Sequence, residues 1–327
     1  MGRTTVFRGF LTAAVLAASI GAEASPTIPM ATVPVGNAGN ANDTTMNSPY
    51  GAVGYNFNIG TYDVTLTQYT AFLNSVASTD TYGLYYDLSL GTNMNVAGIS
   101  RSGSPGSYTY SVIGDGQRPV TYVSWYSAIR FANWLTDGKT ETGAYTITNG
   151  GNNSGTVTLP TTAQRAAWSH GNTTYWYIPD ENEWYKAAYY DPTIPGANKY
   201  WLFPTRSNAY PSADVPPGGS NSANFYGTNG YALTQSTSRI STQNYLTDVG
   251  AYSNSPSYYG TFDQGGDVGQ FNDLDPDVAS MSRGYRGGAW FGSPAVPFEQ
   301  AKQQIAWIHR LGKLYERVKA IEKKLGL

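Results

Sequence analysis

The sequence feature that most constrains this chain is a glycine-rich, acidic loop at residues 259–271. Within it, residues 261–271 hold three glycines interleaved with Asp263, Asp267 and Gln270. Glycine permits the tight backbone that such a loop needs. Backbone carbonyls and side-chain oxygens then converge, as a hard cation such as calcium requires. The loop predicts a cation-binding segment of the core, although composition alone fits a surface loop with Asx-turns equally well.

Composition indicates a globular, exported protein. The chain has 327 residues, of which 40% are hydrophobic, so one large domain can fill a core. Only 13% of residues are charged, while Gly (37) and Tyr (27) are abundant, which favours strands and ordered loops over long surface helices. Cysteine is absent. The sequence therefore excludes disulfides, thiolate metal sites and cysteine nucleophiles.

The charge of the chain is unevenly distributed. Residues 25–298 hold eleven Lys and Arg against eighteen Asp and Glu, whereas residues 299–327 hold seven against three. The first segment is acidic and has no basic stripe. This pattern argues against nucleic acid as a partner.

Residues 1–24 have the three parts of a secretory signal. Arg3 and Arg8 precede an apolar run over residues 9–20, and a small-x-small end closes at Ala24. About twelve apolar residues are too few to span a bilayer. We expect cleavage after Ala24, no membrane span, and a secreted, periplasmic or cell-surface protein.

Local patterns predict the first elements of the domain. Residues 25–50 read as an extended lead-in, and the alternation of apolar residues over 52–62 predicts a strand. Thr65 and Gln68 form a capping box that opens a helix through about Ala77. Ser124 caps a second helix, whose apolar residues repeat at helical spacing. Residues 150–155 are polar and glycine-rich, and we expect a hairpin tip or an insertion there.

Two groups of residues suggest catalysis but have plainer explanations. Residues 180–183 hold three carboxylates, yet Asp180 and Glu183 stand at the spacing of a capping box, where negative charge also suits the helix dipole. His170 is the only histidine of the domain. It cannot form a site with two or three histidines, and no Gly-x-Ser-x-Gly turn offers it a nucleophile.

Five motifs in order resemble the formylglycine-generating enzyme (sulfatase-modifying factor) family. They lie at residues 62–74, 119–135, 178–188, 259–271 and 286–290. The resemblance implies an irregular α+β domain, related to C-type lectins, with short twisted strands and much ordered loop. We place this domain at residues 51–297.

The same resemblance implies structural calcium at two places. A first ion would bind the Asn224 side chain and the Phe225 carbonyl. A second would bind the Asp263 side chain, the Gly266 and Val268 carbonyls, and the side chain at Gln270.

The loop departs from the family pattern at four positions. The usual Asn, Trp, Glu and Trp are replaced by Asp267, Gly269, Gln270 and Phe271. One carboxylate ligand and one large ring are lost, which weakens calcium binding and leaves space in the core, although Asp267 returns a charge.

The end of the family domain is also missing. After residues 286–290 the composition changes, and residues 298–327 are helix formers with a coiled-coil-like apolar stripe. Gly312 interrupts this stripe at a cost of about 1 kcal/mol. The helix either packs on the domain or pairs with copies of itself, and we favour the second. A fusion or a change of reading frame explains the abrupt shift equally well. The stripe comprises Trp307, Leu311, Leu314, Val318, Ile321 and Leu325.

Two functional classes follow from these observations. The first is an exported, non-catalytic binding or assembly module that uses aromatic loops to recognise a protein or glycan and forms a homo-oligomer through its terminal helix. The second is an oxidoreductase, either formylglycine-generating with copper on two cysteines or a non-haem iron oxidase. The absence of cysteine decides against the formylglycine enzyme. The iron oxidase would need histidine ligands from a helical domain that this chain does not contain, so we expect the module.

Overall fold

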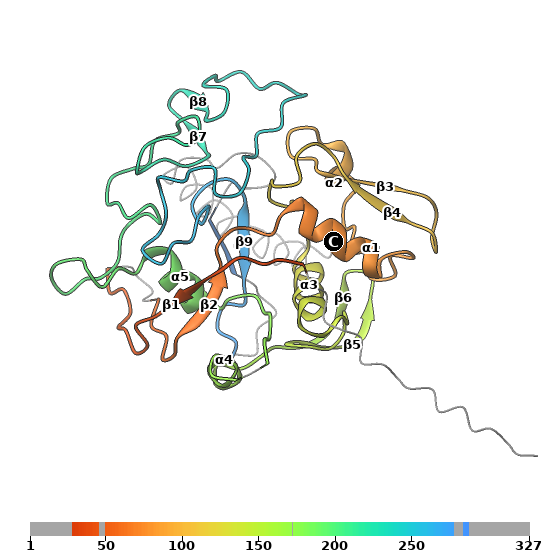
Figure 1. Ribbon diagram of the computed structural model, residues 1–327, viewed down its shortest axis with the longest axis horizontal. Coiled ribbons are helices and arrows are strands. Elements are labelled where there is room, and N and C mark those ends of the chain that lie inside the picture. Colours follow the sequence, from red (N-terminus) through yellow and green to blue (C-terminus); the bar gives the residue numbers. More distant parts are fainter. Residues whose placement is uncertain (1–27, 46–49, 172, 278–283, 288–327) are drawn as a thin grey trace, which may run out of the picture.

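A computed structural model describes residues 28–45, 50–171, 173–277 and 284–287, and Figure 1 shows its arrangement. The predicted signal segment and the predicted C-terminal helix lie outside these residues. Helices and short strands mix along the described chain, which makes the fold α+β. The helices are α1 (Leu66–Val76), α2 (Ser89–Thr92), α3 (Trp125–Asp137), α4 (Thr162–Trp168) and α5 (Glu181–Tyr189).

The strands of the described residues pair only as antiparallel two-stranded sheets, in sequence order. Much of the chain therefore satisfies its backbone through turns and side chains rather than through one large sheet. The pairs are β1 (Thr32–Val35) with β2 (Phe57–Gly60), β3 (Ile99–Ser102) with β4 (Thr109–Val112), β5 (Thr146–Gly151) with β6 (Ser154–Thr158), β7 (Tyr226–Gly227) with β8 (Gly230–Tyr231), and β9 (Gly269–Asn272) with β10 (Gly284–Gly287).

The predicted helix caps are confirmed. The Thr65 hydroxyl accepts from the Gln68 amide at 3.2 Å, and the Gln68 side chain returns a bond to the Thr65 amide. Ser124 caps α3, and Asp180 with Glu183 forms the capping box of α5. Each cap satisfies amides that the first helical turn leaves unpaired, so these polar residues fix where the helices begin.

The core is built around α1 and α3, which pack through aromatic rings. The Phe72 ring lies 5.4 Å from that of Phe131 and 5.3 Å from that of Trp134, centroid to centroid. All three side chains are buried. The opposite side of α3 packs on Tyr145, at the start of the β5–β6 hairpin, which confirms the hairpin expected at residues 150–155.

The strand predicted at the start of the domain is shorter than expected. Of residues 52–62, only β2 is a strand, because the pairing strand β1 is four residues long and offers no further partners. Val53 and Tyr55 are buried nonetheless, which explains the alternation seen in the sequence. Within the predicted extended lead-in, residues 32–35 form β1.

Tertiary folding brings β9 between α5 and α3, where Figure 1 shows it near the centre of the view. Glycine allows the preceding loop to close against the chain. Gly266 has a φ of +99°, and a Cβ there would meet the Asn224 carbonyl oxygen at 2.7 Å. Asp263 and Asp267 also adopt left-handed backbone, with φ of 62° and 58°, which aspartate tolerates better than most residues.

Candidate functional site

A buried ionic cluster joins α5 to α4 and to the residue after β9. Arg165 donates from Nη1 to Oε2 of Glu183 at 2.9 Å and from Nη2 to Oδ2 of Asp273 at 2.8 Å. All three side chains are fully buried. Tyr55 donates to Glu183, and Tyr145 donates to Asp273. Every charge in this Arg165 cluster is paired and hydrogen-bonded, which is how a protein interior holds ionised groups.

The remaining acid of α5 is paired in the same way. Glu181 accepts from the Arg286 Nε at 2.6 Å and from the Asn272 side chain at 2.6 Å. Asn272 and Arg286 stand on β9 and β10, so this contact joins the predicted motif at 286–290 to the helix. The carboxylates of residues 180–183 thus cap and anchor α5, as the sequence predicted.

The two segments predicted to bind calcium lie in direct contact. Asn224 donates from Nδ2 to Oδ1 of Asp267 at 2.6 Å, and the Asp267 amide donates to the Asn224 carbonyl at 2.8 Å. Thr247 adds a bond from its hydroxyl to Oδ2 of Asp267 at 3.1 Å. Asp267, which replaces the asparagine of the family pattern, is therefore a buried hub that ties the loop to residue 224.

A second contact joins the loop to the residues just before α1. Gln270 donates from Nε2 to Oδ1 of Asp63 at 2.6 Å, and its Oε1 accepts from the Trp184 indole at 2.6 Å. The other oxygen of Asp63, Oδ2, has neither exposed surface nor a hydrogen-bond partner among the described residues. A buried oxygen without a partner costs free energy, so Asp63 is an unsatisfied position in the fold.

Three acids in this region carry raised pKa values. Burial raises the pKa of Asp263 to about 6. Burial and then the charge of Asp263 raise the pKa of Asp267 to about 7. Burial raises the pKa of Asp63 well above its ordinary value, and Asp263 and Asp267 add to the effect. We call these three residues the acid cluster. No described Lys or Arg lowers the pKa of any of them, so the cluster lacks a cation.

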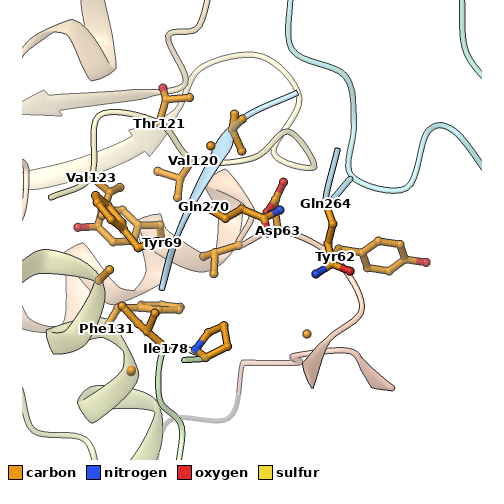
Figure 2. Close-up of a pocket in the computed structure, with 18 of the residues that line it drawn as sticks. Tyr62, Asp63, Tyr69, Val120, Thr121, Val123, Phe131, Ile178, Gln264 and Gln270 are labelled. Atoms are coloured by element: carbon orange, nitrogen blue, oxygen red, sulfur yellow. The ribbon is translucent and has the colours of Figure 1, made fainter. Parts of the chain in front are cut away.

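A cavity of about 510 Å³ opens beside the acid cluster. In Figure 2, Asp63 and Gln270 lie side by side, with Phe131 and Ile178 on one side of them and Tyr62 and Gln264 on the other. The Tyr285 ring lies over Gly269, where a β-carbon would collide with it. Gly269 and Tyr285 both line the cavity.

Comparison with known proteins agrees with the motif order. Residues 18–310 match the family model described as the sulfatase-modifying factor enzyme 1-like domain. The chain belongs to this family. No curated protein and no solved structure matches it. The match covers all five motifs, and it runs past both ends of the domain expected at residues 51–297.

The calcium expected in this sulfatase-modifying factor-like domain can be tested against the side chains. Asp263 fits, because its Oδ2 accepts one hydrogen bond, from the Gly250 amide at 2.6 Å, and its Oδ1 accepts none from a described residue. Asn224 fits as well, since its donors are engaged and its side-chain oxygen makes no bond to a described residue. Gln270 fits poorly, since its oxygen already accepts from Trp184. Across the described part of the chain, no group of three His, Cys, Asp or Glu side chains is placed to hold a metal.

Sequence reasoning missed Asp63, Trp184 and Gln264 as residues of this site. All three line the cavity. Asp63 stands within a family motif, but nothing local distinguishes it from a surface aspartate. His170, weighed above as a catalytic candidate, is exposed. As for membranes, none of the described helices combines the length and apolar character of a spanning segment.

Proposed function

We propose that this chain is an exported, non-catalytic binding module of the sulfatase-modifying factor-like family. The cavity of about 510 Å³ carries this proposal, since an apolar hollow with a few convergent polar groups is the usual form of a ligand site. The chain has no cysteine to hold copper, as the formylglycine-generating members would. Nor are the carboxylates of α5 free for acid-base work, because each is engaged in a cap or an ion pair.

An assay for formylglycine formation tests whether the protein is non-catalytic. Purified protein is incubated with a cysteine-containing sulfatase peptide, copper and oxygen, and the peptide is analysed by mass spectrometry. We expect no aldehyde, because no thiolate is present to begin the reaction. Aldehyde above the level of a blank would overturn the non-catalytic reading.

Calcium belongs to this proposal as a structural ion. The ligands would be the Asp263 side chain and the Gly266 and Val268 carbonyls, with Gln270 as the weakest ligand because its oxygen also accepts from Trp184. A first site would lie at Asn224 and the Phe225 carbonyl. The acid cluster supports the idea, because an added cation would offset its mutual repulsion. We expect weak binding, on the order of 0.1–1 mM, as in extracellular modules.

Self-association through residues 298–327 completes the proposal. An isolated helix of that length is only marginally stable in water, so its apolar stripe needs a partner. Sedimentation of the full chain is compared with that of a double variant, Leu314→Glu with Ile321→Glu. We expect an oligomer that the double variant dissociates, and two monomers would contradict it. Mass spectrometry of the exported protein, with Ser25 expected as its first residue, tests the signal segment.

A further inference from the structure

The cavity beside the acid cluster has a largely apolar wall that includes two acids, Asp63 and Asp267. Aliphatic and aromatic side chains form most of its wall, and they come from many parts of the chain, including α3, residues 120–123 and residues 176–179. Its volume of about 510 Å³ lies within the range of roughly 300–1,000 Å³ that small-molecule sites occupy. The space therefore suits a compact organic molecule whose body is largely apolar.

The charge of the wall restricts that molecule further. Asp63 and Asp267 line the cavity, and no Lys, Arg or His stands among the described residues that do so. The Asp63 carboxyl is the group in need of a partner, because Gln270 satisfies Oδ1 while Oδ2 has none. An anionic ligand would find no cation in this wall, whereas a cationic ligand would supply the missing bond and favour the ionised form of Asp63.

Aromatic rings in the wall of the same cavity favour an organic cation over a bare metal ion. Tyr62 and Phe262, both in the cavity wall, stack with centroids 5.6 Å apart and an interplanar angle of 25°. Trp184 lines the cavity as well and donates its indole N–H to Gln270. Aromatic faces attract ammonium groups and also pack against a flat apolar body.

We propose that this cavity binds a small organic amine, with its ammonium group on the Asp63 carboxylate and its apolar or aromatic body against the α3 side. The inference deepens the binding function proposed above and rests on it. Oδ2 has no exposed surface, so the carboxyl group turns about its terminal torsion to meet the ligand. That torsion is soft in aspartate.

Three probes of similar size and different charge test this proposal on the full chain. They are 2-phenylethylamine, 2-phenylethanol and 3-phenylpropanoate, titrated by calorimetry near neutral pH with calcium held constant. We expect the amine to bind at least about tenfold more tightly than the alcohol, since a charge-assisted bond to a desolvated carboxylate exceeds 1.4 kcal/mol. The propanoate should bind most weakly.

Two variants locate the site. Asp63→Asn can still accept the Gln270 bond, so it should fold while reducing amine affinity to that of the alcohol. Asp248→Asn is the matched control, because Asp248 is exposed and lies outside the cavity. Ala128→Phe, on the cavity face of α3, should weaken the amine and the alcohol alike. Circular dichroism of each variant checks its folding.

Several outcomes would overturn the amine site. The first is equal affinity for the three probes. The second is a preference for the amine that survives Asp63→Asn. The third is that the folded full chain binds none of the probes. None of these would produce an aldehyde in the peptide assay. Failure of the amine site is therefore distinguishable from failure of the non-catalytic reading.

Discussion

The Arg165 cluster and the acid cluster contain the same kinds of acid in opposite electrostatic settings. Glu183 and Asp273 are fully buried, and both are bonded to the guanidinium of Arg165. Asp63, Asp263 and Asp267 are raised in pKa by burial and have no described cation beside them. The first cluster pairs its acids with a cation, while the second has no Lys or Arg beside it among the described residues.

This difference separates acids that are paired with a cation in the fold from acids that have no described cation. In the Arg165 cluster, Coulomb attraction and hydrogen bonds offset part of the loss of water, and burial still raises the pKa of Asp273. In the acid cluster, amide and hydroxyl donors offset it only in part, so protonation, calcium or an organic ammonium would each relieve the charge. Our proposed site therefore rests on carboxyls that have no described cation, and not on the run of carboxylates at residues 180–183, where the pKa of Asp180 is also raised by burial but the acids are engaged in caps and ion pairs.

The largest expected effect comes from removing the cation of the first cluster. Arg165→Leu leaves Glu183 and Asp273 buried without a partner, and we expect a loss of about 3–5 kcal/mol in the free energy of unfolding. Urea denaturation measures it. Arg206→Leu is the control, because Arg206 is 46% exposed. Its partner Asp191 is buried but also accepts bonds from Thr193 and Trp201, so this loss should stay below about 1 kcal/mol. If both variants lost the same free energy of unfolding, the buried Arg165 pairs would be no more important to stability than a half-exposed pair.

Lys186 is a buried base with no acid paired to it among the described residues, so burial shifts its pKa in the opposite direction from those of the acid cluster. Lys186 on α5 is fully buried, burial lowers its pKa from 10.5 to about 8, and its ammonium donates to the Asn37 carbonyl at 3.0 Å. Lys186→Met should raise the free energy of unfolding at pH 7 by about 1–3 kcal/mol, since the charged form is disfavoured in the fold.

The sign of this effect fixes its pH dependence. Above about pH 10.5 Lys186 is neutral in both states and costs no stability. As the pH falls from 10.5 to about 8, the unfolded chain takes up the proton first, so the folded state loses stability. The gain from Lys186→Met should therefore shrink as the pH rises from 8 to 10.5. Thermal melts across this range, with exposed Lys139→Met as the flat control, measure it. A gain that is independent of pH would show that packing, not charge, is responsible.

The smallest expected effect is that of calcium on the acid cluster. With affinity on the order of 0.1–1 mM, about 2 mM calcium should stabilise the fold by roughly 0.5–2 kcal/mol, which a rise in melting temperature reports. Asp263→Asn should abolish the rise. Gln270→Glu should enlarge it, because a carboxylate returns to the position where the family carries one. An unchanged melting temperature, with no ordered cation in the loop, would refute the calcium site.

The sequence by itself determined the local structure of the domain. Capping boxes and apolar spacing predicted where α1, α3 and α5 begin, because a helix start is decided by side chains three or four residues apart. Motif order indicated the family, and the same local reasoning showed that residues 180–183 cap a helix. The strands were less predictable. β2 ends where its partner ends, and nothing in its own residues encodes the length of β1.

Only the tertiary structure decided the site. Gln270 and Asp63 are 207 positions apart, and Arg165 and Asp273 are 108 apart, so no local pattern indicates which acid meets a cation and which does not. The cavity likewise has walls from both ends of the domain. Charge and pKa depend on what surrounds a group after folding, whereas a cap depends on its sequence neighbours. For this reason Asp63 reads as an ordinary aspartate in the sequence and becomes an unsatisfied carboxyl in the fold.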